Sequence, residues 1–125
     1  MKFLVVTFLT AYLGYAIGVY TQMPWWSFAL SSALIALCVQ QSKISTFVSG
    51  FLGIFLLWIL LAFIRDVSND HILSQRVVSI LGIGSSSTLL ILITGFLGGM
   101  VSGLAAITGY HLRSSAKAIL SFNLE

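Results

Sequence analysis

Charged residues are scarce in this chain. Asp, Glu, Lys and Arg together make up 7% of its 125 residues, whereas hydrophobic residues make up 58%. Soluble globular domains carry about 25% charged residues, so this chain has too little polar surface to cover a core in water. The mean hydropathy of +1.06 agrees with this. The composition therefore argues against a water-soluble domain, and the apolar surface must face lipid or other protein.

Three further shortages exclude classes of function. The single cysteine, Cys38, cannot form an intrachain disulfide. The six Lys and Arg residues are scattered at the ends of apolar segments, so the chain lacks the basic patch of nucleic-acid-binding proteins. No Asp, Glu, Lys, Arg or His lies inside a predicted span. This argues against a proton-coupled transporter and against a haem-binding subunit.

Four apolar segments predict an all-α, polytopic membrane protein with four transmembrane helices in a single bundle. The segments cover about 3–20, 25–39, 46–64 and 88–110. The first, third and fourth are about 27, 28 and 35 Å long as helices, which is enough to cross a hydrocarbon core of about 30 Å. The second is about 22 Å long. It crosses by using its polar flanks or by thinning the bilayer, and a re-entrant element is the alternative.

The connections differ in length. Residues 21–24 predict a tight turn, and Trp25 and Trp26 predict an aromatic belt at the membrane interface. The long connection 65–87 alternates polar and apolar residues with a helical period. It predicts a short amphipathic helix on the membrane surface, capped by Asn69 or Asp70 and ending near Gly82.

The tail predicts a second short surface helix from His111 to Glu125. Its buried side would carry four apolar residues: Leu112, Ala116, Ile119 and Leu120. We expect the first apolar segment to be a retained helix and not a signal peptide, because it is long for a signal and no Ala-x-Ala site follows it.

The distribution of basic residues predicts orientation. With four spans, Lys2, Lys43, Arg113 and Lys117 fall on one side of the membrane, and Arg65 and Arg76 on the other. The positive-inside rule then places both termini in the cytoplasm. A bacterial inner membrane is the expected location.

The densest polar cluster follows the third span and consists of five residues: Arg65, Asp66, Asn69, Asp70 and His71. Two carboxylates and an imidazole are metal ligands, but no third strong ligand stands at useful spacing. Ser74 follows His71 at a spacing too common to indicate a catalytic triad. We therefore predict a partner-docking loop, with no catalytic, cofactor or metal site.

Small residues recur along the fourth span. One face of this helix carries Gly95, Gly98, Gly99, Ser102, Gly103 and Ala106. At 100° per residue, these positions fall within an arc of about 140°, which lets another helix backbone approach closely. The first span carries a similar row at Thr10, Gly14 and Gly18. We expect the two rows to face each other or a partner.

One family resemblance adds to this interpretation. It rests on the segment 66–74, the Gly/Ser loop that follows, the run Leu90–Thr94, and the pattern Gly98-Gly99-x-x-x-Gly103-x-Ala105-Ala106-x-Thr108-Gly109. With these features the chain resembles small bacterial inner-membrane proteins that have no assigned function. The resemblance implies four spans and a bacterial origin.

Two functions are compatible with these features. The first is an accessory protein that assembles through its glycine-rich helix faces, with itself as a homo-oligomer or within a larger membrane complex. The alternative is a small oligomeric channel or transporter for a neutral or weakly charged solute, lined by hydroxyls and glycines. The expected surroundings are a lipid bilayer, with no nucleic acid.

Overall fold

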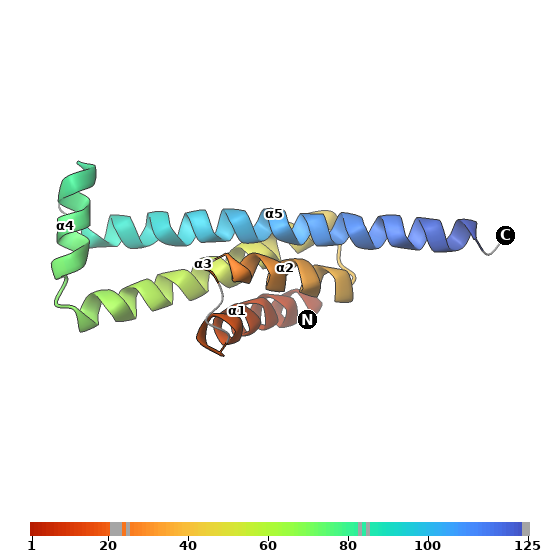
Figure 1. Ribbon diagram of the computed structural model, residues 1–125, viewed down its shortest axis with the longest axis horizontal. Coiled ribbons are helices and arrows are strands. Elements are labelled where there is room, and N and C mark those ends of the chain that lie inside the picture. Colours follow the sequence, from red (N-terminus) through yellow and green to blue (C-terminus); the bar gives the residue numbers. More distant parts are fainter. Residues whose placement is uncertain (21–23, 25, 83, 85, 124–125) are drawn as a thin grey trace.

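The protein is all-helical over the part that the computed structural model describes, which is residues 1–20, 24, 26–82, 84 and 86–123. This confirms the all-α prediction. The five helices in these ranges are α1 (Lys2–Tyr20), α2 (Ser27–Cys38), α3 (Lys43–Ser68), α4 (Ile72–Leu81) and α5 (Ser87–Phe122) (Figure 1). The predicted turn at 21–23, and Trp25 of the aromatic belt, lie outside the described residues.

Three of these helices are long and apolar enough to cross a membrane, by length and composition: α1, α3 and α5, with 19, 26 and 36 residues. They are about 28, 39 and 54 Å long. Helix α2 has 12 residues and is shorter than the segment 25–39 predicted for it. It ends where Val39 takes an extended conformation (φ −105°, ψ 122°) before two glutamines. The apolar run continues beyond the helix, so apolarity alone overestimated the length of α2.

Helices α2 and α3 lie between α1 and α5. Helix α1 packs against α2 and α3, and α5 packs against the same two helices, while α1 and α5 share no contact among the described residues. The start of α1 and the connection between α2 and α3 lie at the end of the packed helices that is away from α4, and α5 continues beyond them to the C-terminus (Figure 1). Helix α4 crosses the other end, nearly perpendicular to α3 and α5 (Figure 1). Lys2 and Lys43 are therefore at the end opposite α4.

The short helix α4 confirms the prediction of a helix that ends near Gly82, but its predicted cap is wrong. His71 holds the N-cap position in the left-handed region (φ 59°), and its side chain makes no capping hydrogen bond. Asp70 is also left-handed, with φ 50°. An N-cap side chain bonds to its helix from an extended backbone, so neither Asn69 nor Asp70 caps α4. At the other end, Gly82 (φ 65°) is a left-handed C-cap.

The tail is part of α5, so the expectation of a separate surface helix starting at His111 is wrong. Helix α5 continues through Tyr110 to Phe122, because no glycine or proline after Gly109 breaks it. Leu112, Ile119 and Leu120 are exposed by 56, 62 and 63%. The end of α5 projects beyond every other helix (Figure 1).

Candidate functional site

The six predicted small residues of α5 are all buried within the chain itself. Three of them, Gly98, Gly99 and Gly103, meet aromatic side chains of α3, and Gly95 meets the aliphatic side chain of Ile59. A Cβ added at Gly99 would lie 3.0 Å from the ring of Phe51 and 3.0 Å from its carbonyl oxygen. A Cβ at Gly103 would lie 2.7 Å from the ring of Phe47. The rings of α3 therefore pack directly against the glycines of this small face.

The aromatic row of α3 that packs against these glycines is a feature that the sequence analysis missed. Phe47, Phe51 and Phe55 stand four residues apart on α3, so they share one helix face. The rings of successive members are 6.2 and 5.4 Å apart, centroid to centroid. Trp58 continues the row and meets Gly98. The four-residue period of phenylalanines was the available signal.

A hydroxyl contact ties three helices together beside this row. The hydroxyl of Ser102 on α5 donates to the carbonyl oxygen of Gly50 on α3, at 2.8 Å. It also lies 2.6 Å from the hydroxyl oxygen of Ser32 on α2. Ser102 is fully buried. Small residues on α5 thus hold α2 and α3 through both close packing and hydrogen bonds.

The small row of α1 does not meet the small row of α5, so the expectation that the two rows face each other is wrong. Thr10 and Gly14 face α3 instead: a Cβ at Gly53 would lie 3.2 Å from Cβ of Thr10, and a Cβ at Gly14 would lie 2.9 Å from Ile54. The small face of α5 is already filled by rings, which leaves no room for α1. Gly18 is exposed, with no atom within 4 Å of its added Cβ.

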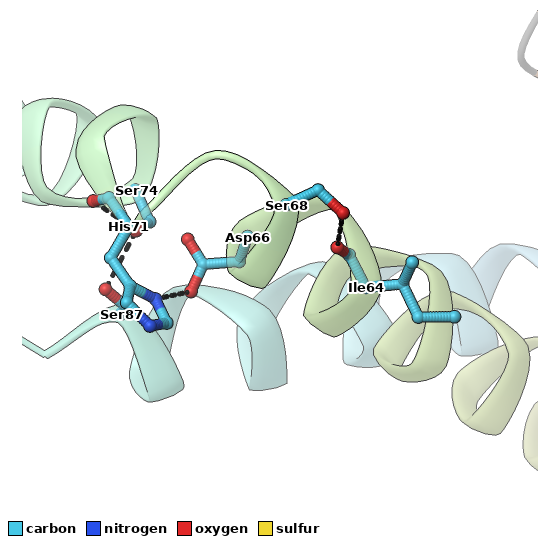
Figure 2. Close-up of polar contacts among 6 residues, drawn as sticks. All are labelled: Ile64, Asp66, Ser68, His71, Ser74 and Ser87. Atoms are coloured by element: carbon cyan, nitrogen blue, oxygen red, sulfur yellow. Dashed lines mark hydrogen bonds and ion pairs between the residues drawn. The ribbon is translucent and has the colours of Figure 1, made fainter.

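The predicted docking loop forms the corner where α3, α4 and α5 meet (Figure 2). Asp66, in the last turn of α3, is buried, and its Oδ2 lies 2.6 Å from Nδ1 of His71. The backbone N–H of His71 also donates to the carbonyl oxygen of Asp66, at 3.1 Å. Two consecutive left-handed residues, Asp70 and His71, fold the imidazole back onto the carboxylate.

The start of α5 is attached to the same corner. The hydroxyl of Ser74 on α4 donates to the carbonyl oxygen of His71 at 3.0 Å. It lies 2.8 Å from the hydroxyl oxygen of Ser87, the first residue of α5 (Figure 2). Asp66 lies beyond the apolar run 46–64. The nearby Ser74 hydroxyl and then the His71 imidazole lower the pKa of the Asp66 carboxyl from its ordinary value, against a smaller opposing effect of burial.

A cavity of about 170 Å³ lies under this corner, between α3, α4 and α5. Of the five predicted loop residues, Arg65, Asp66 and Asn69 line it. His71 joins Asp66 without lining the cavity, and Asp70 is exposed. The corner therefore gathers four of the five predicted residues at one place.

The chemistry of the corner is limited. The Ser74 hydroxyl bonds to the backbone of His71 and not to its imidazole, so the geometry is not that of a nucleophile and its base. In the described parts of the chain, no three His, Cys, Asp or Glu side chains gather as metal ligands do.

Comparisons with family models, with curated proteins and with solved structures find no match to this chain.

Proposed function

We propose that this protein is an accessory subunit of a bacterial inner membrane, with four spans and both termini in the cytoplasm, that joins a larger membrane complex. Basic residues support the orientation. Lys2 and Lys43 begin α1 and α3 at the end of the molecule that α4 does not occupy, while Arg76 belongs to α4. The second span is α2 with its flanking residues, which crosses a locally thinned bilayer.

The projecting end of α5 carries this proposal. Helix α5 is about 54 Å long, and a hydrocarbon core is about 30 Å thick, so about 24 Å of the helix extends past the bilayer. Leu112, Ala116 and Ile119 are spaced by four and three residues and form one stripe on this extension. A straight continuation of a span cannot lay this stripe on the membrane surface. The stripe needs a protein to cover it.

The expected occupant is an amphipathic helix of a partner subunit, laid along the stripe. Burial of each large apolar side chain contributes about 1.5–3 kcal/mol. The glycine face is not the docking surface in this proposal, because the rings of α3 fill it. Its role is to fix α5 so that the extension points away from the spans.

The test is the native mass in a mild detergent that preserves membrane complexes. We expect the wild-type protein, purified from its own membranes, to exceed its chain mass of 13.6 kDa by a fixed amount. Ile119→Asp should release the chain at 13.6 kDa. Ser121→Asp is the matched control, because Ser121 lies about 160° from Ile119 around the helix. A wild-type chain that runs alone refutes the proposal.

A second function, a small solute channel, is favoured by a series of cavities along the helices. A cavity of about 340 Å³ between α1, α2 and α3 lies toward the α4 end, and one of about 130 Å³ lies beside Gln41 and Tyr110. Between them, a void of about 10 Å³ is lined by the hydroxyls of Thr10, Ser32 and Ser49 among others. That is the space of about one water molecule.

In the channel proposal, Ile54 closes the path between these cavities, and its replacement tests the proposal. The side chain of Ile54 is fully buried next to Gly14, which lines the larger cavity, and one helical turn after Gly50, which lines the void. For a channel, Ile54→Ala should raise glycerol flux into liposomes above that of the wild type. Leu56→Ala, on the exposed side of α3, is the control. Equal flux in all three proteins rejects the channel.

A further inference from the structure

A small polar cavity lies where the end of α2 meets α5. Its volume is about 130 Å³, and seven residues line it: Val39, Gln40, Gln41, Tyr110, Arg113, Ser114 and Lys117. Pockets for whole small molecules measure about 300–1,000 Å³. This cavity has room for one compact group of a larger molecule or for a small ion.

Hydrogen-bond donors dominate its lining. Arg113 and Lys117 carry positive charge and have no acceptor atoms, and Tyr110 and Ser114 carry hydroxyls. The described acids, Asp66 and Asp70, lie at the opposite end of the molecule, next to α4. The chemistry of the cavity therefore favours an anion.

An unpartnered amide strengthens this argument independently of charge. The amide oxygen of Gln41 accepts a hydrogen bond from the hydroxyl of Ser49 at 3.2 Å. Its amide nitrogen, Nε2, is buried and has no hydrogen-bond partner. A buried donor without an acceptor costs about 1–3 kcal/mol, so a ligand that brings an acceptor to this amide gains affinity.

A hydrogen bond to α2 fixes the position of the Arg113 side chain. Nη1 of Arg113 donates to the carbonyl oxygen of Leu37 at 2.8 Å, in the last turn of α2. This bond satisfies a helix-terminal carbonyl and holds the guanidinium at the cavity. Lys117 stands one turn further along the same face of α5. That face is about 150° from the apolar stripe at Leu112, so the cavity and the docking surface are separate.

We propose that this cavity binds a phosphate group, held by Arg113, Lys117 and the Nε2 of Gln41. The cavity lies just beyond the apolar run 88–110, at the level of lipid headgroups. Basic pockets at this depth between membrane helices receive anionic headgroups. The phosphate of an anionic phospholipid and free inorganic phosphate share the chemistry that these donors recognise.

The experiment measures ligand binding to the purified full-length chain. One arm reconstitutes the protein in nanodiscs of phosphatidylcholine with a spin-labelled phosphatidylglycerol and measures the motionally restricted fraction of the label. The other arm titrates inorganic phosphate into protein in neutral detergent and follows the melting temperature. Lys117→Gln should weaken binding about fivefold, as expected for one basic contact. Lys117 is exposed, so this change leaves the fold intact.

Two further variants separate the site from general surface charge. Lys43→Gln removes the same charge at the same end but outside the cavity, and it should leave binding unchanged. Gln41→Leu keeps the side-chain size and every charge, and it should weaken binding as well. Binding in the lipid arm alone assigns a headgroup, and binding in both arms assigns phosphate in general.

Either of two results overturns the inference. One is the same binding by the wild type and by Lys117→Gln in both arms. The other is an equal loss in Lys43→Gln, which indicates diffuse attraction without a site. Neither result depends on a partner subunit, so this inference and the proposed function fail independently.

Discussion

The clearest consequence of the packing concerns Gly99, at the centre of the small face of α5. A Cβ at this position meets both the ring and the backbone carbonyl oxygen of Phe51, each at 3.0 Å. The ring can rotate aside, but the carbonyl belongs to the backbone of α3 and cannot move alone. Overpacking of this kind costs about 1–3 kcal/mol. Alanine regains about 1 kcal/mol of helix propensity over glycine.

The balance predicts a graded series. Gly99→Ala should lower the free energy of unfolding by about 0–2 kcal/mol, which is the overpacking cost less the propensity gain. Gly99→Leu places three more carbon atoms against α3 and should cost more than about 3 kcal/mol. The assay is thermal and denaturant unfolding of the detergent-solubilised monomer. Thr108→Leu adds a similar side chain on the exposed side of α5 and should leave stability nearly unchanged.

The reasoning fails if Gly99→Leu unfolds at the same temperature as the wild type. That result means that α3 does not fill the small face. A stable Gly99→Leu monomer that loses a partner shows that the small face is the docking surface. The extension of α5 is then not the surface that binds the partner subunit.

Three other predictions follow from the structure. Ser102→Ala removes the hydrogen bond to Gly50 and should lower the free energy of unfolding by about 0.5–1.5 kcal/mol in the same assay. The lowered pKa of Asp66 stabilises the corner above its ordinary pKa of 3.8, and this stabilisation is lost as the pH falls through the lowered value. The hydrogen-exchange protection factors of the α4 amides should therefore fall in acid, and Asp66→Asn should abolish that fall. For the orientation, a cysteine at Asp70, in a Cys38→Ala background, should react with a membrane-impermeant maleimide added outside the cells, whereas one at Lys43 should not.

The three long apolar helices and the small face of α5 were predictable because both are local properties. Helical length and apolarity identify α1, α3 and α5, and a four-residue glycine period identifies a helix side that admits close packing. The partner of that side was not predictable in the same way. Two regular rows could have packed against it, Thr10–Gly18 of α1 and Phe47–Phe55 of α3. Which row packs there depends on how the side chains of the two helices fit together, and this is a property of the assembled helices.

The corner shows a second limit. Asp66 and His71 were selected as polar residues in one connection, but their contact depends on two left-handed residues in succession. Asp and His enter the left-handed region more often than most residues, but neither is glycine, and the residue types do not mark two such residues in succession. The tail was misjudged for a related reason: its amphipathic pattern fits a surface helix and a projecting helix equally, and only the unbroken backbone through Tyr110 decides between them.

The most direct test of the account places a photoreactive amino acid at Ile119 and, separately, at Leu97 on the exposed side of α5, in intact cells. The proposal predicts that Ile119 yields a single adduct of discrete mass above 13.6 kDa and that Leu97 yields none. Absence of an adduct from Ile119, or an equal yield from both positions, would contradict the assignment of the α5 extension as a docking helix.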